Sequence, residues 1–403
     1  MNNKLFDLMK YASEHVPYYK QLFYKNDITI DSIENIEKAF KRTPILTKQI
    51  LNENIDQMIS EKIQLSDIVW EYTSGTSGTP LKIGKTSIER MNSATNLWKW
   101  RRKYFNISPS SPYAYFTSLD NGLKYSTEQN ISYLSEIYLE DSDLDIYYNI
   151  LVNQKITWIA GSPSVLFILL NYMKDNEKES ISTLEYIELT GEQILKEEKD
   201  KIADFFRCNV AEQYGTREVW AIAKECNRGK FHVMENDVLL EINQNDGILV
   251  TALNLYSVPI IRYYIDDVLE HDSLCDCGCN SNTIKIVKSR SLEFLHIGKT
   301  KIISPILLRI SINNIIKKHG IDIKQFQYIQ EDYNILRCYL SYRKINGVNC
   351  AIIKEMLRKE INEFYKLPDS FILEVIEYDS LNSKIRRGKL NYFLSLIKPT
   401  LGI

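Results

Sequence analysis

The spacing of apolar residues changes character twice along the 403-residue chain. Up to residue 65, apolar positions such as Leu5, Leu8 and Ala12 recur at helical spacing, with Pro17 as an interruption. Over residues 66–290, short apolar runs alternate with helical stretches, and beyond them a new mixture of strands and helices begins. The pattern therefore predicts a helical start, a large α/β region and a smaller α+β region.

Strand, tight turn and helix follow one another repeatedly in the middle region. Ser162 is placed to cap a helix, and Pro163 stands at its first turn. This order is typical of a parallel sheet, in which ligands bind beyond the carboxyl ends of the strands. The apolar runs predict strands at 156–159, 184–189 and 210–213 and helices at 162–173 and 198–206.

Two further groups of strands complete the expected fold. The turn signal Asn245-Asp246-Gly247 between apolar runs predicts a hairpin, which with residues 260–264 forms a small β-subdomain. The last region predicts a strand pair around Gly298, helices at 305–318 and 351–364 and strands at 336–342 and 371–376. The fold class is therefore α/β: a large N-terminal domain of residues 1–289 with parallel sheets and a small β-subdomain, and a small α+β C-terminal domain of residues 290–403.

Charge is spread unevenly over the chain. The net charge of −2 does not fit a protein that binds polyanions as a whole, so we expect no nucleic-acid partner. From Arg290 onward there are 19 Lys+Arg and 11 Asp+Glu, which leaves 31 of the 50 basic and 41 of the 52 acidic residues for the rest. A basic C-terminal part suits an anionic partner such as a nucleotide, a coenzyme A phosphate or an acidic carrier protein; a lysine-rich solvated surface is the alternative.

The N-terminal residues and the cysteines indicate a compartment. The chain begins without the apolar core of a signal peptide, and no apolar run approaches the length of a membrane span. Its seven cysteines are an odd number in a chain without an export signal, which argues for the reducing cytosol. We therefore expect a cytoplasmic protein that has no membrane contact.

The stretch from Tyr72 to Lys82 reads YTSGTSGTPLK, a composition that suits neither a packed helix nor a strand. Glycine allows the backbone to approach a ligand closely, and the hydroxyl and N–H groups supply hydrogen-bond donors. Lys82 adds a cation. Such a loop suits a polyphosphate, although it lacks Walker spacing, and a surface turn rich in Ser, Thr and Gly is the alternative.

In the order of its residues, YTSGTSGTPLK resembles the phosphate-binding loop of the adenylate-forming enzymes, the superfamily that includes the acyl-coenzyme A synthetases. Further stretches resemble its other motifs, in the required order: Thr190-Gly191-Glu192, Tyr214-Gly215-Thr216-Arg217-Glu218, Pro259 to Asp267, Ser289-Arg290 and Gly388-Lys389-Leu390. Within the superfamily the chain is similar to the branch of phenylacetate–coenzyme A ligase and its capsule-cluster relatives. The resemblance covers essentially the whole chain.

The resemblance implies a nucleotide site. Tyr214 would stack on the adenine, and Asp267 would accept hydrogen bonds from the ribose hydroxyls, as a carboxylate can. Asp266 stands where the family has glycine, so Asp266 stays open as the ribose ligand, although the register favours Asp267. The nucleotide-binding residues implied in this way are Thr73, Ser74, Gly75, Thr76, Ser77, Gly78, Thr79, Gly191, Glu192, Tyr214, Gly215, Thr216, Asp267 and Arg290.

The resemblance also implies the catalytic groups. Glu218 would hold the Mg²⁺ that bridges the phosphates, and a carboxylate is a hard oxygen ligand suited to that ion; an acid at a helix N-terminus is the alternative for Glu218. Lys389 matches the lysine that meets the carboxylate and the α-phosphate, with Lys384 as its rival. Lys82 completes the set. The C-terminal domain would be mobile and swing about a hinge at Arg290 and Glu293.

The implied activity is that of an AMP-forming acid–thiol ligase. It would convert a carboxylic acid and ATP to an acyl-adenylate, then transfer the acyl group to coenzyme A. The alternatives are transfer to a carrier-protein phosphopantetheine or an amine, and a non-catalytic nucleotide-binding relative, to which Arg217, Asp266 and Ser289 point. The acid is left open, because the aromatic residues Tyr113, Tyr115, Phe116 and Trp158 suit either an aromatic-acid pocket or the core. A homodimer is the default expectation.

Three cysteines are concentrated in Cys275-Asp276-Cys277-Gly278-Cys279, and Cys226 and His232 lie upstream. Thiolate and imidazole ligands in fours suit tetrahedral Zn²⁺. Some members of the resembled branch carry such a cluster, which implies a structural zinc site at Cys226, His232, Cys275 and Cys277 with Cys279 as a substitute. Reduced free thiols are the alternative.

Overall fold

The chain divides into two compact units, residues 1–193 with 199–290 and residues 194–198 with 291–403. The predicted boundary at 289/290 falls beside this division, while the mobility of the C-terminal domain stays a prediction. Among the described residues, no helix combines the length and the apolar character that crossing a membrane requires. The computed structural model describes residues 2–72, 81–117, 119, 123–136, 138–192, 194–243, 247–288, 295–298, 301–303, 305–343, 347–364, 366–378 and 393–397.

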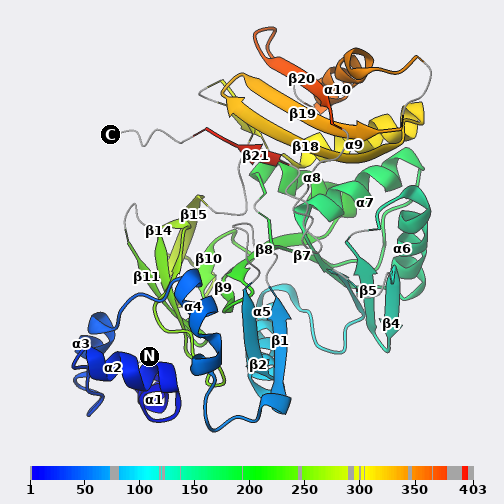
Figure 1. The fold of residues 1–403 in the computed structure, drawn as a ribbon. Coiled ribbons are helices and arrows are strands. Elements are labelled where there is room, and N and C mark those ends of the chain that lie inside the picture. The colour runs from blue at the N-terminus through cyan, green and yellow to red at the C-terminus, as the bar shows by residue number, and fades with distance from the viewer. Residues whose placement is uncertain are drawn as a thin grey trace. The chain divides into compact units, whose positions relative to one another are not determined.

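The first unit begins with short helices, drawn in blue in Figure 1. The first three of them bury a common apolar core that includes Leu5, Leu8 and Ala12 and extends to Leu253 and Ile261. Pro17 separates the first two, because proline is tolerated only in the first turn of a helix. The helices are α1 (Asn2–His15), α2 (Pro17–Lys25), α3 (Ile36–Arg42) and α4 (Lys48–Asn54), with 3₁₀ turns at Ile55–Met58 and Leu65–Asp67.

The main sheet of this unit has ten described strands in the order β14-β15-β10-β9-β8-β7-β6-β3-β5-β4. Their bounds are β3 (Tyr113–Thr117), β4 (Tyr125–Glu128), β5 (Ile131–Ser135), β6 (Trp158–Gly161), β7 (Tyr186–Thr190), β8 (Asn209–Thr216), β9 (Trp220–Glu225), β10 (Phe231–Val233), β14 (Val268–His271) and β15 (Thr283–Lys288). The strands predicted at 156–159, 184–189 and 210–213 are β6, β7 and β8.

The sheet is mixed. From β5 through β3, β6 and β7 to β8 the neighbours pair in parallel, as predicted. From β8 the order continues antiparallel through β9, β10, β15 and β14. The change occurs because only residues 217–219 join β8 to β9, and so short a connection cannot make the crossover that a parallel strand needs.

Helices α5 (Ser87–Phe105), α6 (Asp141–Asn153), α7 (Pro163–Asp175) and α8 (Lys196–Phe206) accompany this sheet (Figure 1). The predicted helices at 162–173 and 198–206 are α7 and α8. Pro163 opens α7 as expected, but the side chain of Ser162 makes no capping hydrogen bond. The Glu192 carboxylate caps α7 instead, since it accepts from the Ser164 amide at 3.1 Å and from the Ser164 hydroxyl.

Two small sheets complete the first unit. One is the hairpin of β1 (Ile68–Tyr72) and β2 (Lys82–Thr86), which enclose residues 73–81. The other is the predicted β-subdomain, in which β12 (Ile248–Ala252) pairs with both β11 (Val238–Ile242) and β13 (Tyr263–Ile265).

The second unit is an α+β fold. Its four-stranded sheet has the order β20-β19-β18-β21, and α9 and α10 contact each other and pack on it. The prediction missed β18 and β21. The elements are β16 (Leu295–Ile297), β17 (Lys301–Ile303), α9 (Ile306–His319), β18 (Ile323–Asp332), β19 (Ile335–Tyr342), α10 (Cys350–Phe364), β20 (Ile372–Glu377) and β21 (Phe393–Ser395).

Candidate active site

Two of the predicted motif turns lie side by side at the carboxyl edge of the main sheet. Thr190 at the end of β7 is paired with Gln213 of β8, so Gly191 follows β7 at the level where Tyr214 and Gly215 lie near the end of β8. Gly191 has φ of 81°, which favours glycine. A Cβ on Gly215 would lie 1.9 Å from the carbonyl oxygen of Trp220, so only glycine permits this approach of β8 to β9.

The structure brings Tyr214 and Asp267 into contact. The Tyr214 hydroxyl donates to Asp267 Oδ2 at 2.7 Å, and the two residues are 8% and 4% exposed. Asp267 directly precedes β14, which is four places from β8 in the sheet. Asp266 is exposed to solvent. The match to the family motif favours Asp267 over Asp266, and Asp267 is also the carboxylate that contacts Tyr214.

Glu218 lies in the turn between β8 and β9, so the alternative of an acid at a helix N-terminus does not apply. It is 6% exposed, and its Oε1 accepts a hydrogen bond from the Tyr263 hydroxyl at 2.9 Å. Two residues earlier, the Thr216 hydroxyl accepts from the Val219 amide at 3.4 Å, which braces the same turn. A single oriented carboxylate is what a Mg²⁺ ion takes from a protein when phosphates supply further ligands.

The predicted phosphate-binding loop connects the two strands of the β1–β2 hairpin. Its residues Thr73 to Thr79 lie outside the described residues, as do Arg290, Lys384 and Lys389. Lys82, the first residue of β2, is described: its ammonium nitrogen stands 3.7 Å from the centre of the Trp70 ring on β1. Glu192, expected at the adenine, is engaged at the start of α7.

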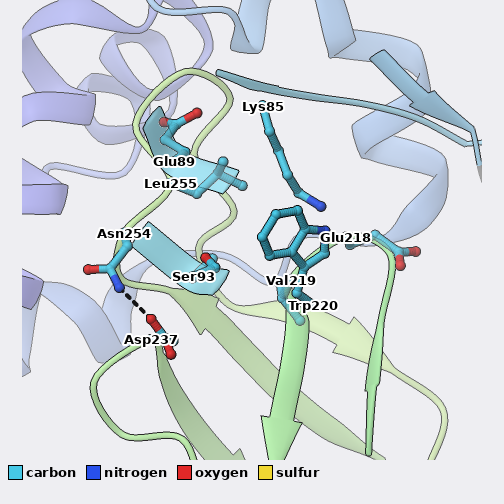
Figure 2. Close-up of a pocket in the computed structure, with 10 residues that line it drawn as sticks. Lys85, Glu89, Ser93, Glu218, Val219, Trp220, Asp237, Asn254 and Leu255 are labelled. Atoms are coloured by element: carbon cyan, nitrogen blue, oxygen red, sulfur yellow. Dashed lines mark hydrogen bonds between the residues drawn. The ribbon is translucent and has the colours of Figure 1, made fainter. Parts of the chain in front are cut away.

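The sequence prediction missed Lys85, which is 4% exposed and lies close to Glu218. Figure 2 shows its side chain pointing toward Trp220 and Glu218, at one end of a small cavity. Burial lowers the pKa of Lys85 to about 8, against the opposite effect of the Glu71 carboxylate. A signal existed: alternation along β2 places residue 85 on the same face as the buried Leu81 and Ile83.

A second buried charge cluster lies in the core of the main sheet. Arg101 on α5 donates to both oxygens of Glu188 on β7, at 2.7 and 2.9 Å, and Lys224 on β9 donates to Glu188 as well. Burial alone would raise the pKa of Glu188, but the two cations hold it far below its usual range. All three residues are at most 7% exposed.

The aromatic residues considered for an acid pocket are partly core residues. Trp158 is 1% exposed and stacks on Tyr113 at 4.6 Å between ring centres, and the Arg101 guanidinium lies 4.7 Å from its ring centre. Phe116 is 3% exposed and packs on Tyr147. Their packing supports the core alternative for Trp158 and Phe116.

Cys226, His232, Cys275 and Cys277 form a cluster in which all four ligand atoms lie within 4.8 Å of one another. Cys226 and His232 flank the β9–β10 turn, and the two other cysteines lie on the connection from β14 to β15, the strand beside β10. The Cys226 and Cys275 sulfurs are 3.7 Å apart, and His232 Nε2 is 3.3 Å from Cys277 Sγ. The substitute, Cys279, bonds Ser281 instead.

The groups around this cluster orient its members. The Arg228 amide donates to Cys226 Sγ at 3.3 Å, and His232 Nδ1 lies 3.4 Å from the Ser281 hydroxyl, which leaves Nε2 facing the cysteines. Burial lowers the pKa of His232, which favours the neutral imidazole that metal ligation requires.

Comparison with known proteins supports the resemblance. No model of a protein family matches the chain. Protein CapK of Staphylococcus aureus is 21% identical over 355 residues, which are 84% of this chain and 77% of that protein.

Solved structures agree over nearly the full length. A 2-hydroxyisobutyryl-CoA ligase in complex with 2-HIB-AMP has a TM-score of 0.62 at 14% identity, over 98% of this chain and 88% of that chain. An acyl acid amido synthetase, AtGH3.15, has a TM-score of 0.53 at 10% identity, over 97% and 91%. The chain therefore has the fold of the adenylate-forming acyl-CoA ligases, as its motifs predict.

Proposed function

We propose that this protein is an AMP-forming ligase, which activates a carboxylic acid as an acyl-adenylate and transfers the acyl group to coenzyme A. The observation that carries the proposal is the convergence of Tyr214, Asp267 and Glu218 beside the carboxyl edge of the main sheet, from two motifs that lie far apart in the sequence. The fold, common to ligases solved with acyl-adenylates, supports it.

Each residue has a distinct task in the proposed reaction. Tyr214 and Asp267 bind the adenosine. Gly191 and Gly215 have no side chains, which lets the backbone approach the nucleotide closely. Residues 73–79, Lys82 and Arg290 hold the phosphates. Lys389, with Lys384 as its rival, neutralises the reacting carboxylate and α-phosphate. The acid attacks the α-phosphorus itself, so catalysis consists of positioning and charge neutralisation without a protein nucleophile.

Glu218 is the residue that would hold Mg²⁺. The ion, when bound, neutralises charge on the phosphates of ATP. The Tyr263 hydroxyl at 2.9 Å orients the carboxylate, as groups behind a metal ligand commonly do.

The solved structures that share the fold differ in the type of acyl transfer that they are named for. The 2-hydroxyisobutyryl-CoA ligase was solved with 2-HIB-AMP and CoA in its thioesterification state, whereas the other neighbour is an amido synthetase. The higher TM-score of the CoA ligase favours coenzyme A as our proposal, with a phosphopantetheine carrier or an amine as the alternative acceptor.

The experiment that tests the function is ATP–pyrophosphate exchange with a panel of aliphatic, hydroxylated and aromatic carboxylic acids. Acid-dependent exchange supports adenylation, and an acceptor screen with coenzyme A, pantetheine and amines then identifies the second step. Nucleotide binding without exchange for any acid would instead support a non-catalytic relative.

Replacing Asp267 by asparagine tests the ribose contact. Since hydrogen bonds to a charged group contribute about 1.5–3 kcal/mol, we expect AMP affinity measured by calorimetry to fall at least about tenfold. Asp266→Asn is the matched control, because that neighbouring side chain is exposed, and it should bind AMP as the unaltered protein does. The reverse ranking of the two variants would move the ribose ligand to Asp266.

We also propose that Cys226, His232, Cys275 and Cys277 hold a structural zinc ion. With Zn–S near 2.3 Å and Zn–N near 2.0 Å, a tetrahedral site has S–S edges of about 3.8 Å and S–N edges of about 3.5 Å. The observed 3.7 and 3.3 Å are close to these values.

Metal analysis of the purified protein should find about one zinc per chain. Cys275→Ser should lose the metal and melt at a lower temperature, because metal binding contributes to folding. Cys279→Ser is the control and should keep it, since Cys279 bonds Ser281 outside the cluster. Protein without stoichiometric zinc would favour the alternative of free thiols.

A further inference from the structure

Lys85 makes contacts that no task in the proposed reaction requires. Its ammonium nitrogen lies 3.2 Å from Glu71 Oε2 on β1, donates to the carbonyl oxygen of Arg217 and stands 4.6 Å from the centre of the Trp220 ring. A buried ammonium group costs free energy unless its donors find acceptors, so these contacts define where Lys85 can lie.

The contacts of Lys85 converge on the turn that carries Glu218. The Arg217 carbonyl belongs to the peptide bond that leads into Glu218. On the other side, Trp220 has φ of 62°, a left-handed conformation that a bulky residue keeps only when its surroundings support it. The Lys85 ammonium over its ring and Glu71 Oε2, 3.5 Å from its indole nitrogen, provide that support. Both sides of the turn are thus fastened to the β1–β2 hairpin.

We propose that Lys85 is a positioning residue that fixes Glu218 for holding Mg²⁺, an inference that rests on the proposed function. Lys85 holds the backbone ahead of Glu218, and Tyr263 holds its carboxylate. Because Lys85 and Glu71 lie on the two strands that enclose residues 73–81, the same contacts keep the carboxylate in register with the ends of the glycine-rich segment. In Figure 2 the Lys85 side chain reaches from β2 to this turn.

The test compares nucleotide affinities with and without Mg²⁺ by calorimetry, using adenosine 5′-(α,β-methylene)triphosphate, which cannot release pyrophosphate. In Lys85→Met, we expect the gain in affinity that Mg²⁺ provides to shrink by about tenfold or more, the usual effect of losing a group behind a metal ligand. AMP affinity should stay within about twofold. Lys85→Arg keeps the charge and should recover part of the gain.

Lys178→Met is the matched control. Lys178 also pairs with a carboxylate, Asp145 at 2.8 Å, and lies over an aromatic ring, Tyr148, but it follows α7 and contacts none of those site residues that the structure describes. It should keep the full gain from Mg²⁺.

Several results would overturn the proposal. Lys85→Met could melt at a lower temperature yet keep the full gain from Mg²⁺, which would make Lys85 purely structural. The unaltered protein could bind the analogue equally with and without Mg²⁺. If it bound no nucleotide at all, the proposed function would fail and this inference with it. If Lys85→Met does not fold, Glu71→Gln serves as the second variant, because it removes the countercharge of Lys85. It should also reduce the gain in affinity from Mg²⁺, and an unchanged gain would contradict the proposal.

Discussion

Glu218→Gln is expected to lower acid-dependent ATP–pyrophosphate exchange by at least about a hundredfold. A metal ion supplies several kcal/mol of charge stabilisation in the transition state, and each 1.36 kcal/mol is about tenfold in rate. Glutamine keeps the size of the side chain and can still accept from Tyr263, but it lacks the negative charge that Mg²⁺ prefers. AMP affinity should change little, because in the proposed site other residues bind the adenosine.

Two companion variants sharpen this measurement. Tyr263→Phe removes the hydrogen bond to Glu218 and should lower the exchange rate by about tenfold. The effect is smaller because Tyr263 only orients the carboxylate that would hold the metal. Glu270→Gln is the matched control, an exposed glutamate on β14, and should exchange normally. If Glu218→Gln kept the rate of the unaltered protein, the metal-holding role would pass to another residue.

Glu188→Gln is expected to destabilise the protein by about 3–5 kcal/mol, measured by urea unfolding. The variant leaves Arg101 and Lys224 buried without their countercharge, and an uncompensated buried charge is among the most costly defects in a core. The Glu188 carboxylate stays ionised near neutral pH, because the two cations hold its pKa far below the usual range. Its contribution should therefore be complete above the ordinary glutamate pKa of about 4.5 and fall progressively as the pH drops below that value.

Glu128→Gln on β4 is the control for this change, since Glu128 is exposed and surface substitutions usually stay within about 0.5 kcal/mol. A double-mutant cycle with Lys224→Met isolates the pair. Because the two residues are in contact, the double variant should lose less than the sum of the single losses. Additive losses, or a Glu188→Gln protein as stable as the control, would show that the cluster carries no coupled energy.

Most element types followed from local patterns. The helices α7 and α8, the hairpin of β11 and β12 and the strands β6, β7 and β8 depend on periodicity and turn residues, which neighbours in sequence determine. The strand β18 was missed, as was β21. The continuation of the sheet beyond β8 is antiparallel because the connection to β9 is short, a fact that the apolar pattern does not express.

Local residue patterns were enough to find the candidate chemical groups of this chain: a glycine-rich segment, three acidic or tyrosine motifs in order and a set of cysteines with one histidine. Which of these groups meet depends on long-range packing, which the local patterns do not contain. Tyr214 reaches Asp267, and Cys226 reaches Cys275, because β14 and β15 return to the same sheet as β8 and β9. Lys85 is a further example. Alternation along β2 predicts that its side chain points inward, but long-range packing fixes its partners, Glu71, Arg217 and Trp220.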